Sequence, residues 1–469
     1  MGVSRRDVFK VGISSALAYS LTGFVRPARA ENYSYDPPEN IPYSEAREEI
    51  NQIIGKGEKP HILKVREGVW SAIGYALGNS ILIETDEGSV IIDTTESPAA
   101  MKEIIAEFRK RSNQPIKYVI YTHNHADHYR GTHVFYEPEM TVVAHEQFIP
   151  EVKLQAQRGR RSQMGAVAMF GLLFPREKRF PSLSIWPEPG ITRLRWDQVA
   201  PDKMIWPTKT FADQYSFRLG GLSFNLIHTP GETPDQIIVH VPEYNMVCCA
   251  DNFYASFPNL YTIRGTSYRP VMEWAEAQDA VIKLSPEILV PAHGQPVYEK
   301  DKIKNVLENY RDAISHVHEE ALQAARDAVP IDEAVGKAVL PNHLAELPYL
   351  QEFYGSVEYS FREIYHSLVG WFDGDPVNLQ PQSRKDLGAD VLAIAGSTGK
   401  VLEHAESAQK EGRHQAALEL CEMVLLNYPD NQAARRMKIA SLTAMSRQSV
   451  NAATVNWYRT FSVWEQQKI

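Results

Sequence analysis

A cluster of residues that commonly bind metals follows an apolar run ending at Tyr121. Imidazole and carboxylate groups are ligands that Zn²⁺ accepts readily in proteins. On an extended loop, side chains two residues apart can point the same way, and the residues that follow can reach a second site. The cluster predicts metal binding, with a surface histidine run as the alternative. Its members are His123, His125, Asp127 and His128.

Three more candidate ligands stand where other apolar runs end. They are Glu232 in a Pro/Gly-rich turn, Asp251 after the run 245–250, and His293 before a glycine. Each of them puts a hard or borderline metal ligand into a strand-to-loop turn. A surface histidine run would not explain this recurrence, so we group the three with the first cluster.

The elements that must position these residues alternate between strands and helices. Short apolar runs between Gly and Asn turn signals predict strands, whereas 101–111 and 271–284 have helical periodicity. The pair Gly220-Gly221 predicts a hairpin. We therefore expect an α/β domain over residues 31–300, with strands near 63–65, 70–75, 81–83, 90–93, 118–121, 141–144, 215–219, 222–227, 236–241, 245–250 and 288–290.

Strand patterns stop near residue 300, and long helical patterns follow. The segment 412–434 is typical of one or two tetratricopeptide-like helix pairs, which are too few to be stable alone. We expect residues 301–469 to form an all-α domain in which these pairs pack on neighbouring helices or on another subunit. The expected helices are 302–328, 350–368, 391–408, 413–427 and 431–445.

The pattern of residues 1–30 predicts that they form a targeting segment. Arg5-Arg6 precedes an apolar stretch of about 15 residues, and Ala28-Arg29-Ala30 ends in a cleavage pattern. These features indicate a twin-arginine signal peptide and a periplasmic or secreted protein, and the stretch is too short and polar for stable membrane insertion. The segment holds five basic residues and one acidic residue, so its removal changes the net charge from -9 to -13. We do not expect so acidic a protein to bind nucleic acid, because phosphates require a basic face.

Taken together, the motifs resemble the metallo-β-lactamase superfamily. The shared features are a strand followed by H-x-H-x-D-H, a third ligand in a T-P-G turn, a bridging aspartate and a last histidine before glycine. The resemblance implies an αββα sandwich with two metal ions, for which zinc is the expected metal. By position, His123, His125 and Glu232 would bind the first ion, Asp127, His128 and His293 the second, and Asp251 would bridge them.

Glu232 indicates which family of the superfamily the sequence resembles, because most superfamily members carry histidine in that turn. With glutamate at this position, the sequence resembles the alkylsulfatases of the superfamily. It resembles them also in the stretches 169–175, 259–265, 343–346, 371–376 and 429–434. This resemblance implies that residues 301–469 form a dimerisation domain and that the protein is a homodimer. The family usually has glutamate where Asp251 stands. Its members also commonly continue into a lipid-carrier-like C-terminal domain, which we expect this chain to lack because the sequence ends at Ile469.

The resemblance implies hydrolysis of a small anionic ester, an alkyl sulfate, to an alcohol and inorganic sulfate. Two divalent cations held close together acidify a shared water and clamp an ester oxygen. The non-reacting sulfate oxygens need a cation, and the guanidinium of Arg264 can hold an oxyanion through two hydrogen bonds. Asn259 could donate another hydrogen bond, and Arg269 is a further candidate. The residues predicted to be catalytic are Asp127, Asn259 and Arg264.

Two other interpretations are open. The same metal site could cleave a phosphodiester, a lactone or a β-lactam, since Glu232 and Arg264 favour an anionic ester without separating sulfate from phosphate. Alternatively, the chain could be a non-catalytic periplasmic interaction protein with a structural metal. Seven candidate ligands count against this last interpretation, because structural zinc sites are as a rule closed and mononuclear.

Overall fold

The computed structural model describes residues 41–197, 199 and 203–469, and the predicted signal peptide lies outside these residues. The described chain packs into two compact units. The first comprises residues 56–163 and 181–368, and the second comprises 41–55, 164–180 and 369–469. Within the described ranges, none of the helices is both long enough and apolar enough to span a membrane.

The first unit contains a seven-stranded sheet in the order β1-β2-β3-β4-β5-β6-β9. Neighbouring strands from β1 to β4 are antiparallel, and those from β4 to β9 are parallel. The strands are β1 (His61–Arg66), β2 (Val69–Ile73), β3 (Ser80–Thr85), β4 (Gly88–Ile92), β5 (Ile116–Ile120), β6 (Thr141–His145) and β9 (Lys209–Phe211).

The same unit contains a six-stranded sheet in the order β10 to β15. Gly220 and Gly221 join its first two strands with φ angles of +50° and +82°, which confirms the predicted hairpin. Only the pair β13–β14 is parallel. The strands are β10 (Gln214–Leu219), β11 (Leu222–His228), β12 (Ile237–Val241), β13 (Met246–Ala250), β14 (Ile288–Pro291) and β15 (Val297–Tyr298).

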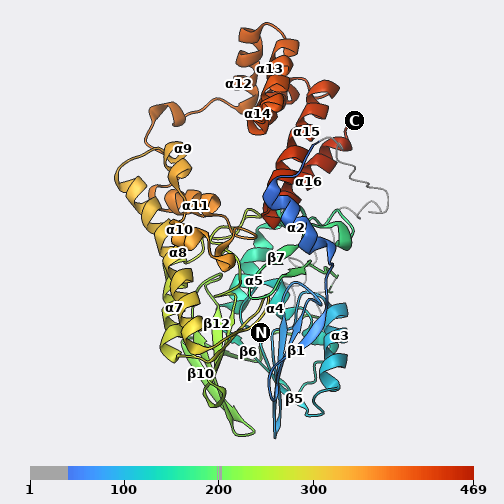
Figure 1. Cartoon of the computed structure of the whole chain (residues 1–469), viewed down its shortest axis with the longest axis vertical. Helices are drawn as coiled ribbons and strands as arrows, with labels where there is room; N and C mark the ends of the chain where they lie inside the picture. Colours follow the sequence, from blue (N-terminus) through green and yellow to red (C-terminus); the bar gives the residue numbers. More distant parts are fainter. Residues whose placement is uncertain (1–40, 198, 200–202) are drawn as a thin grey trace, which may run out of the picture. The chain divides into compact units, whose positions relative to one another are not determined.

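The two sheets pack face to face between helices, with α3 (Pro98–Arg109) on one side and α7 (Val271–Leu284) and α8 (Lys300–Arg326) on the other (Figure 1). Alternate residues of a strand point to opposite faces. Val90 and Ile92 therefore meet Phe224 and Leu226 between the sheets, while Ile91 packs under α3. Because both faces are buried, the strands read as continuous apolar runs. The predicted αββα sandwich is confirmed.

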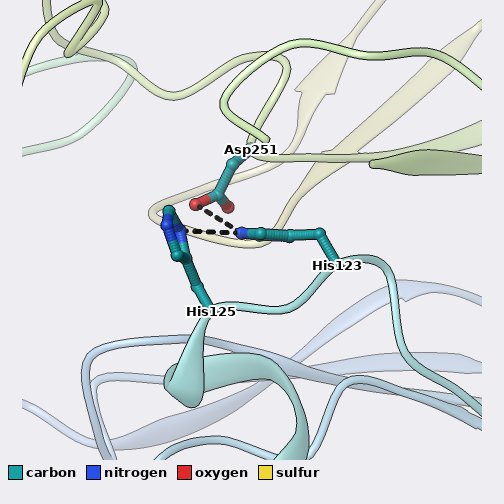
Figure 2. Close-up of side chains that lie close together, drawn as sticks. All are labelled: His123, His125 and Asp251. Atoms are coloured by element: carbon teal, nitrogen blue, oxygen red, sulfur yellow. Dashed lines mark hydrogen bonds and ion pairs between the residues drawn. The ribbon is translucent and has the colours of Figure 1, made fainter. Parts of the chain in front are cut away.

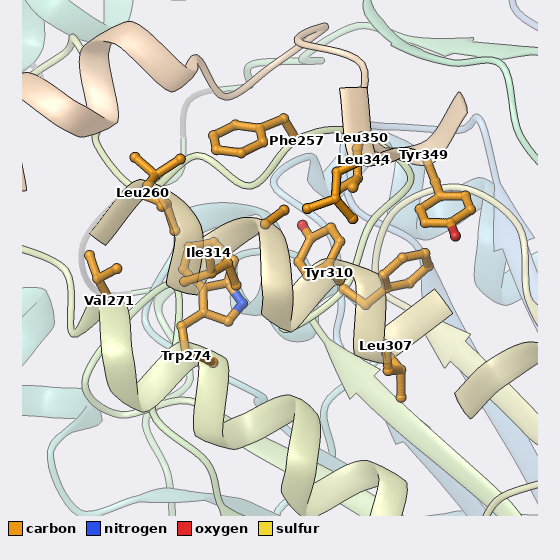
Figure 3. Packing of buried hydrophobic residues seen from close by; sticks show 14 of the residues in the cluster. Phe257, Leu260, Val271, Trp274, Leu307, Tyr310, Ile314, Leu344, Tyr349 and Leu350 are labelled. Atoms are coloured by element: carbon orange, nitrogen blue, oxygen red, sulfur yellow. The ribbon is translucent and has the colours of Figure 1, made fainter. Parts of the chain in front are cut away.

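Helical segments up to residue 368 pack with the second sheet. Trp274 of α7 and Tyr310 of α8 are fully buried in one cluster with Leu344, Tyr349 and Leu350 (Figure 3). Each such large apolar side chain stabilises the fold by roughly 1.5–3 kcal/mol. The first compact unit accordingly ends at residue 368, whereas we expected the α/β domain to end at residue 300. The helices after α8 in this unit are α9 (Ile331–Ala334), α10 (Asn342–Ala345) and α11 (Val357–Val369).

Residues 151–209 contain further elements. The helices in and next to this segment are α5 (Phe148–Gln157) and α6 (Gly159–Met169). A small two-stranded sheet follows, formed by β7 (Ser182–Ser184) and β8 (Gly190–Thr192).

The second unit is all helical. It contains α2 (Glu45–Gly55), α12 (Arg384–Ala395), α13 (Thr398–Lys410), α14 (His414–Asn427), α15 (Gln432–Gln448) and α16 (Ala452–Gln466). The predicted continuous helix 391–408 is wrong. Gly396 ends α12 with φ +80°, and the side chain of Ser397 accepts a hydrogen bond from the Lys400 N–H to cap α13. The expected helical C-terminal region is confirmed.

Candidate metal centre

The candidate ligands come from four strand ends of the first unit. The loop after β5 carries the first four and leads into the short helix α4 (Ala126–Tyr129). Glu232 lies in the turn between β11 and β12, Asp251 follows β13, and His293 follows β14. The N–H of Ile237 donates to the carbonyl of Thr122 at 3.0 Å and so joins the two sheets at this edge.

The first group consists of His123, His125 and Asp251 (Figure 2). His123 Nε2 lies 3.0 Å from His125 Nδ1 and 3.7 Å from Asp251 Oδ2. One ligand atom from each residue falls within 4.8 Å of the others, and all three side chains are buried. This spacing allows the three residues to share one cation.

The second group consists of Asp127, His128 and His293. Asp127 Oδ2 lies 3.5 Å from His128 Nε2 and 3.4 Å from His293 Nε2. Asp251 Oδ2 lies 3.6 Å from His128 Nε2 and 3.2 Å from His293 Nε2, so it faces this group as well as the first. This is the position that a bridging carboxylate would take.

Glu232 lies at the edge of the first group. Its Oε1 is 3.7 Å from His125 Nδ1 and 2.6 Å from Arg269 Nη1, and both members of the Glu232–Arg269 pair are buried. The other carboxylate oxygen, Oε2, is buried and has no hydrogen-bond partner among the described residues. Glu232 is therefore held by a cation from the protein on one side and has one oxygen free to bind metal.

The electrostatics of the two groups suit divalent cations. Burial lowers the pKa of His123 and His125, so both imidazoles are neutral, as ligation requires. Burial opposes charge at His293 too, but Asp251 and Asp127 outweigh it and raise its pKa to about 9. The carboxylates therefore attract positive charge to the site. His128 Nε2 and Asp251 Oδ1 are buried without hydrogen-bond partners in the described chain, so the donor set fits divalent metal ions.

Asp93, at the end of β4, is a site residue that the sequence analysis missed. It is buried and accepts from His128 Nδ1 at 2.8 Å and from the N–H of Thr122 at 2.9 Å. A carboxylate behind a histidine fixes the ring orientation and presents the other nitrogen to the metal. The available signal was an aspartate that directly follows the apolar run 90–92.

Arg264, a predicted anion ligand, lies beside the first group. Its Nη2 is 3.1 Å from His125 Nε2, and burial lowers the pKa of this arginine. The backbone N–H of Asn259 donates to the Tyr254 hydroxyl at 2.7 Å. The Asn259 side-chain nitrogen is buried and unpaired within the described ranges, so it can still donate to a ligand. The nine site residues predicted from the sequence all lie in the first unit. Arg264 contacts the first group directly, through His125.

Comparisons with known proteins agree with this geometry. Residues 73–293 match the family model described as the metallo-beta-lactamase superfamily, so the sandwich and its ligand groups define a protein of that class with a divalent-metal site. Residues 330–466 match the model described as alkyl sulfatase dimerisation. The dimerisation match therefore begins after the predicted boundary at residue 300 and before the first compact unit ends at residue 368.

Curated relatives make the assignment narrower. The chain is 34% identical to a linear primary-alkylsulfatase from a Pseudomonas strain over 80% of this chain and 72% of the relative. It belongs to the alkylsulfatase family. An (R)-specific secondary-alkylsulfatase from Pseudomonas sp. is 26% identical over 88% of this chain, which spans 62% of that protein's length.

The fold is shared with a solved structure. A stereoselective inverting sec-alkylsulfatase from Pseudomonas sp. superposes with a TM-score of 0.81 at 20% identity, over 97% of this chain and 78% of the other. The match extends over nearly the whole chain, so both the sandwich and the helical region have counterparts in that structure.

Proposed function

We propose that this protein is an exported zinc hydrolase that cleaves alkyl sulfate esters into an alcohol and inorganic sulfate. The observation that carries the proposal is the 3.1 Å contact between Arg264 and His125. It places a guanidinium beside the candidate metal ligands in a chain that is 34% identical to a linear primary-alkylsulfatase. A sulfate ester suits this pairing, because metal ions can activate its ester oxygen and a guanidinium can hold its other oxygens.

The residues of this chain would divide the work as follows. Arg264 would hold the non-reacting sulfate oxygens with its planar fork of N–H groups, and the free Asn259 amide would donate to another oxygen. Arg269 is paired with Glu232, so Arg264 is the cation left for the substrate. When bound, divalent cations would supply an acidified water and charge stabilisation at the ester oxygen.

We propose two zinc ions per chain, with the ligands that the sequence analysis assigned. Support comes from two ligand groups that meet at Asp251, which faces histidines of both. Metal analysis of the purified protein should give two zinc ions per chain. A value of one would leave the Asp127, His128 and His293 group without its assigned role.

The activity is tested by measuring sulfate release from hexyl, octyl and dodecyl sulfate with the zinc-loaded protein. A chelated sample serves as control, and bis-p-nitrophenyl phosphate and nitrocefin are assayed alongside. Chelator-sensitive sulfate release is the expected result, and its dependence on chain length defines the substrate range. Cleavage of the phosphodiester or of nitrocefin with intact sulfate esters would refute the substrate but keep the metal site.

We also propose a homodimer formed through the helical region. The match to a dimerisation model over residues 330–466 supports it. So do large apolar side chains that the second unit leaves exposed: Trp371 is 73% exposed, Val377 78% and Ile394 88%. A second copy of the chain would remove these side chains from water, which is favourable for apolar groups.

Export through the twin-arginine route to the periplasm or outside is the remaining part of the proposal, and residues 1–30 support it. Replacing Arg5 and Arg6 with lysine should retain the protein in the cytoplasm of a bacterial host, whereas the parent should be recovered outside it. Mass spectrometry of the exported parent should show an N-terminus at Glu31. Unchanged export of the double variant would contradict this route.

A further inference from the structure

Polar side chains next to the candidate ligands form hydrogen bonds with one another. Asn124 stands between His123 and His125, and its Nδ2 donates to Asp235 Oδ1 at 2.5 Å. Asn124 is 1% exposed and Asp235 is fully buried. Asp235 belongs to the same turn as Glu232, which comes from the other sheet. The bond therefore joins two ligand loops that lie far apart in sequence.

The Asn124 side chain is held on its second polar atom as well. Gln155, near the end of α5, donates to Asn124 Oδ1. With its amide nitrogen on Asp235 and its oxygen on Gln155, Asn124 can adopt only one orientation that satisfies both bonds. The loop between the two histidines is thus fixed by contacts on both sides.

The turn that carries Glu232 is also tied to the Asp251 loop. Gln236 donates to Asn252 Oδ1, and Asn252 Nδ2 donates to the carbonyl of Thr229 at 3.1 Å. Gly231 allows this approach, because a Cβ there would collide with the Asn252 side chain. Asn252 is in turn held by α7, through Gln278 Nε2 to its carbonyl at 2.7 Å. The loops bearing His123, Glu232 and Asp251 are therefore connected by buried side-chain bonds.

We propose that Asn124 and Asp235 are positioning residues, which hold the Glu232 turn against the His123–His125 loop so that all three ligands reach one metal ion. The inference rests on the proposed metal-dependent function. The two segments are also joined by a backbone hydrogen bond, which the Ile237 N–H donates to the Thr122 carbonyl. One backbone hydrogen bond leaves the two segments free to rotate relative to each other. Outer partners of this kind typically change metal affinity by about 10–100-fold when they are lost.

The test compares Asp235→Ala, which removes the acceptor for Asn124, with Asp235→Asn, which keeps an oxygen at the same place. Val90→Ala is the control for general loss of stability, because Val90 belongs to the apolar cluster between the sheets and is not a candidate ligand. Zinc affinity is measured by chelator competition on the full-length protein, and the visible spectrum of the cobalt-substituted protein reports ligand geometry. No substrate is needed for either readout.

We expect Asp235→Ala to weaken zinc binding by about 10–100-fold and to alter the cobalt spectrum. Asp235→Asn should stay within about threefold of the parent, and Val90→Ala should lower the melting temperature with zinc affinity unchanged. Parental zinc affinity in Asp235→Ala would overturn the proposal, as would equal losses in the Ala and Asn variants. If the parent releases no sulfate but Asp235→Ala still loses zinc, the proposed substrate fails while the positioning role stands.

Discussion

At the scale of single residues, charge and hydrogen bonding set the chemistry of the site. Burial keeps His123 and His125 neutral, while carboxylates raise the pKa of His293 to about 9. Asp93 orients His128 from behind. The same buried region thus contains neutral ligands, charged ligands and a residue that fixes their direction, which is the arrangement that a metal site requires.

Loss of a ligand of the second group should remove one metal ion. We expect Asp127→Ala and His293→Ala to lower zinc content from two ions per chain towards one. Sulfate release should fall by at least about 100-fold, because about 3 kcal/mol of charge stabilisation is lost at the transition state. Metal analysis and sulfate assays check this, with His61→Ala at an exposed position as control. Zinc content that stayed near two would contradict the ligand assignment.

Arg264 should affect the substrate rather than the metal. Arg264→Ala should lower kcat/KM for alkyl sulfates by about 100-fold or more, as removal of an anion-stabilising donor does, with zinc content unchanged. Arg264→Lys should recover only part of the loss, since lysine keeps the charge without the planar fork. Arg218→Ala, an exposed cation on β10, is the matched control. Full turnover by the Ala variant would rule out the clamp.

At the scale of elements, the strand ends bring the site together, and buried groups between loops hold them in place. Glu96, after β4, accepts the N–H groups of Leu77 at 2.9 Å and of Arg195 at 2.7 Å. It thereby joins the β2–β3 loop to the segment at Arg195, which lies 99 residues after Glu96 in the chain. Burial, followed by the nearby charge of Asp127, raises the pKa of Glu96 to about 7.

This pKa predicts a pH-dependent stability. Between the ordinary value of 4.5 and about 7, the folded protein keeps a proton on Glu96 that the unfolded chain has lost. The stabilisation is complete below 4.5 and declines as pH rises through this window. Relative to Glu96→Gln, the metal-free parent should lose about 2–3 kcal/mol of unfolding free energy between pH 5 and pH 8. Denaturant unfolding at several pH values measures this, and a relative gain with rising pH would disprove it.

At the scale of the whole molecule, the two compact units are built in different ways. The first is stabilised by apolar layers between the sheets and under α3, α7 and α8. The second has smaller buried clusters and exposes Trp371, Val377 and Ile394. The proposed homodimer would cover these exposed side chains with a second copy of the chain.

Oligomeric state tests this view. The parent should have twice the mass of one chain in solution, and the double variant Trp371→Ser, Ile394→Ser should weaken the dimer by about 10-fold or more, because buried tryptophan often dominates such interfaces. Leu154→Ser is the control, since Leu154 is 40% exposed on α5, outside the dimerisation match. Light scattering over a concentration series gives the masses. A parent that is monomeric at all concentrations would refute the homodimer.

Local patterns in the sequence predicted most strands of the first unit and the chemical type of the site, whereas the sandwich was implied by the resemblance to the metallo-β-lactamase superfamily. Short apolar runs bounded by turn residues predicted most strands, and two adjacent glycines predicted the Gly220-Gly221 hairpin. Ligand types at strand ends indicated a metal site before any contact was known. These features depend on neighbours in the chain, so a single sequence is enough to predict them.

Contacts between distant residues were decided only by the tertiary structure. It paired Glu232 with Arg269 and placed Asp93 behind His128. Local sequence patterns also did not predict the helix break at Gly396 or the packing of helices 301–368 with the sheets. The physical reason is that such contacts depend on how separate loops approach once the core is buried, and residue order alone does not specify that distance.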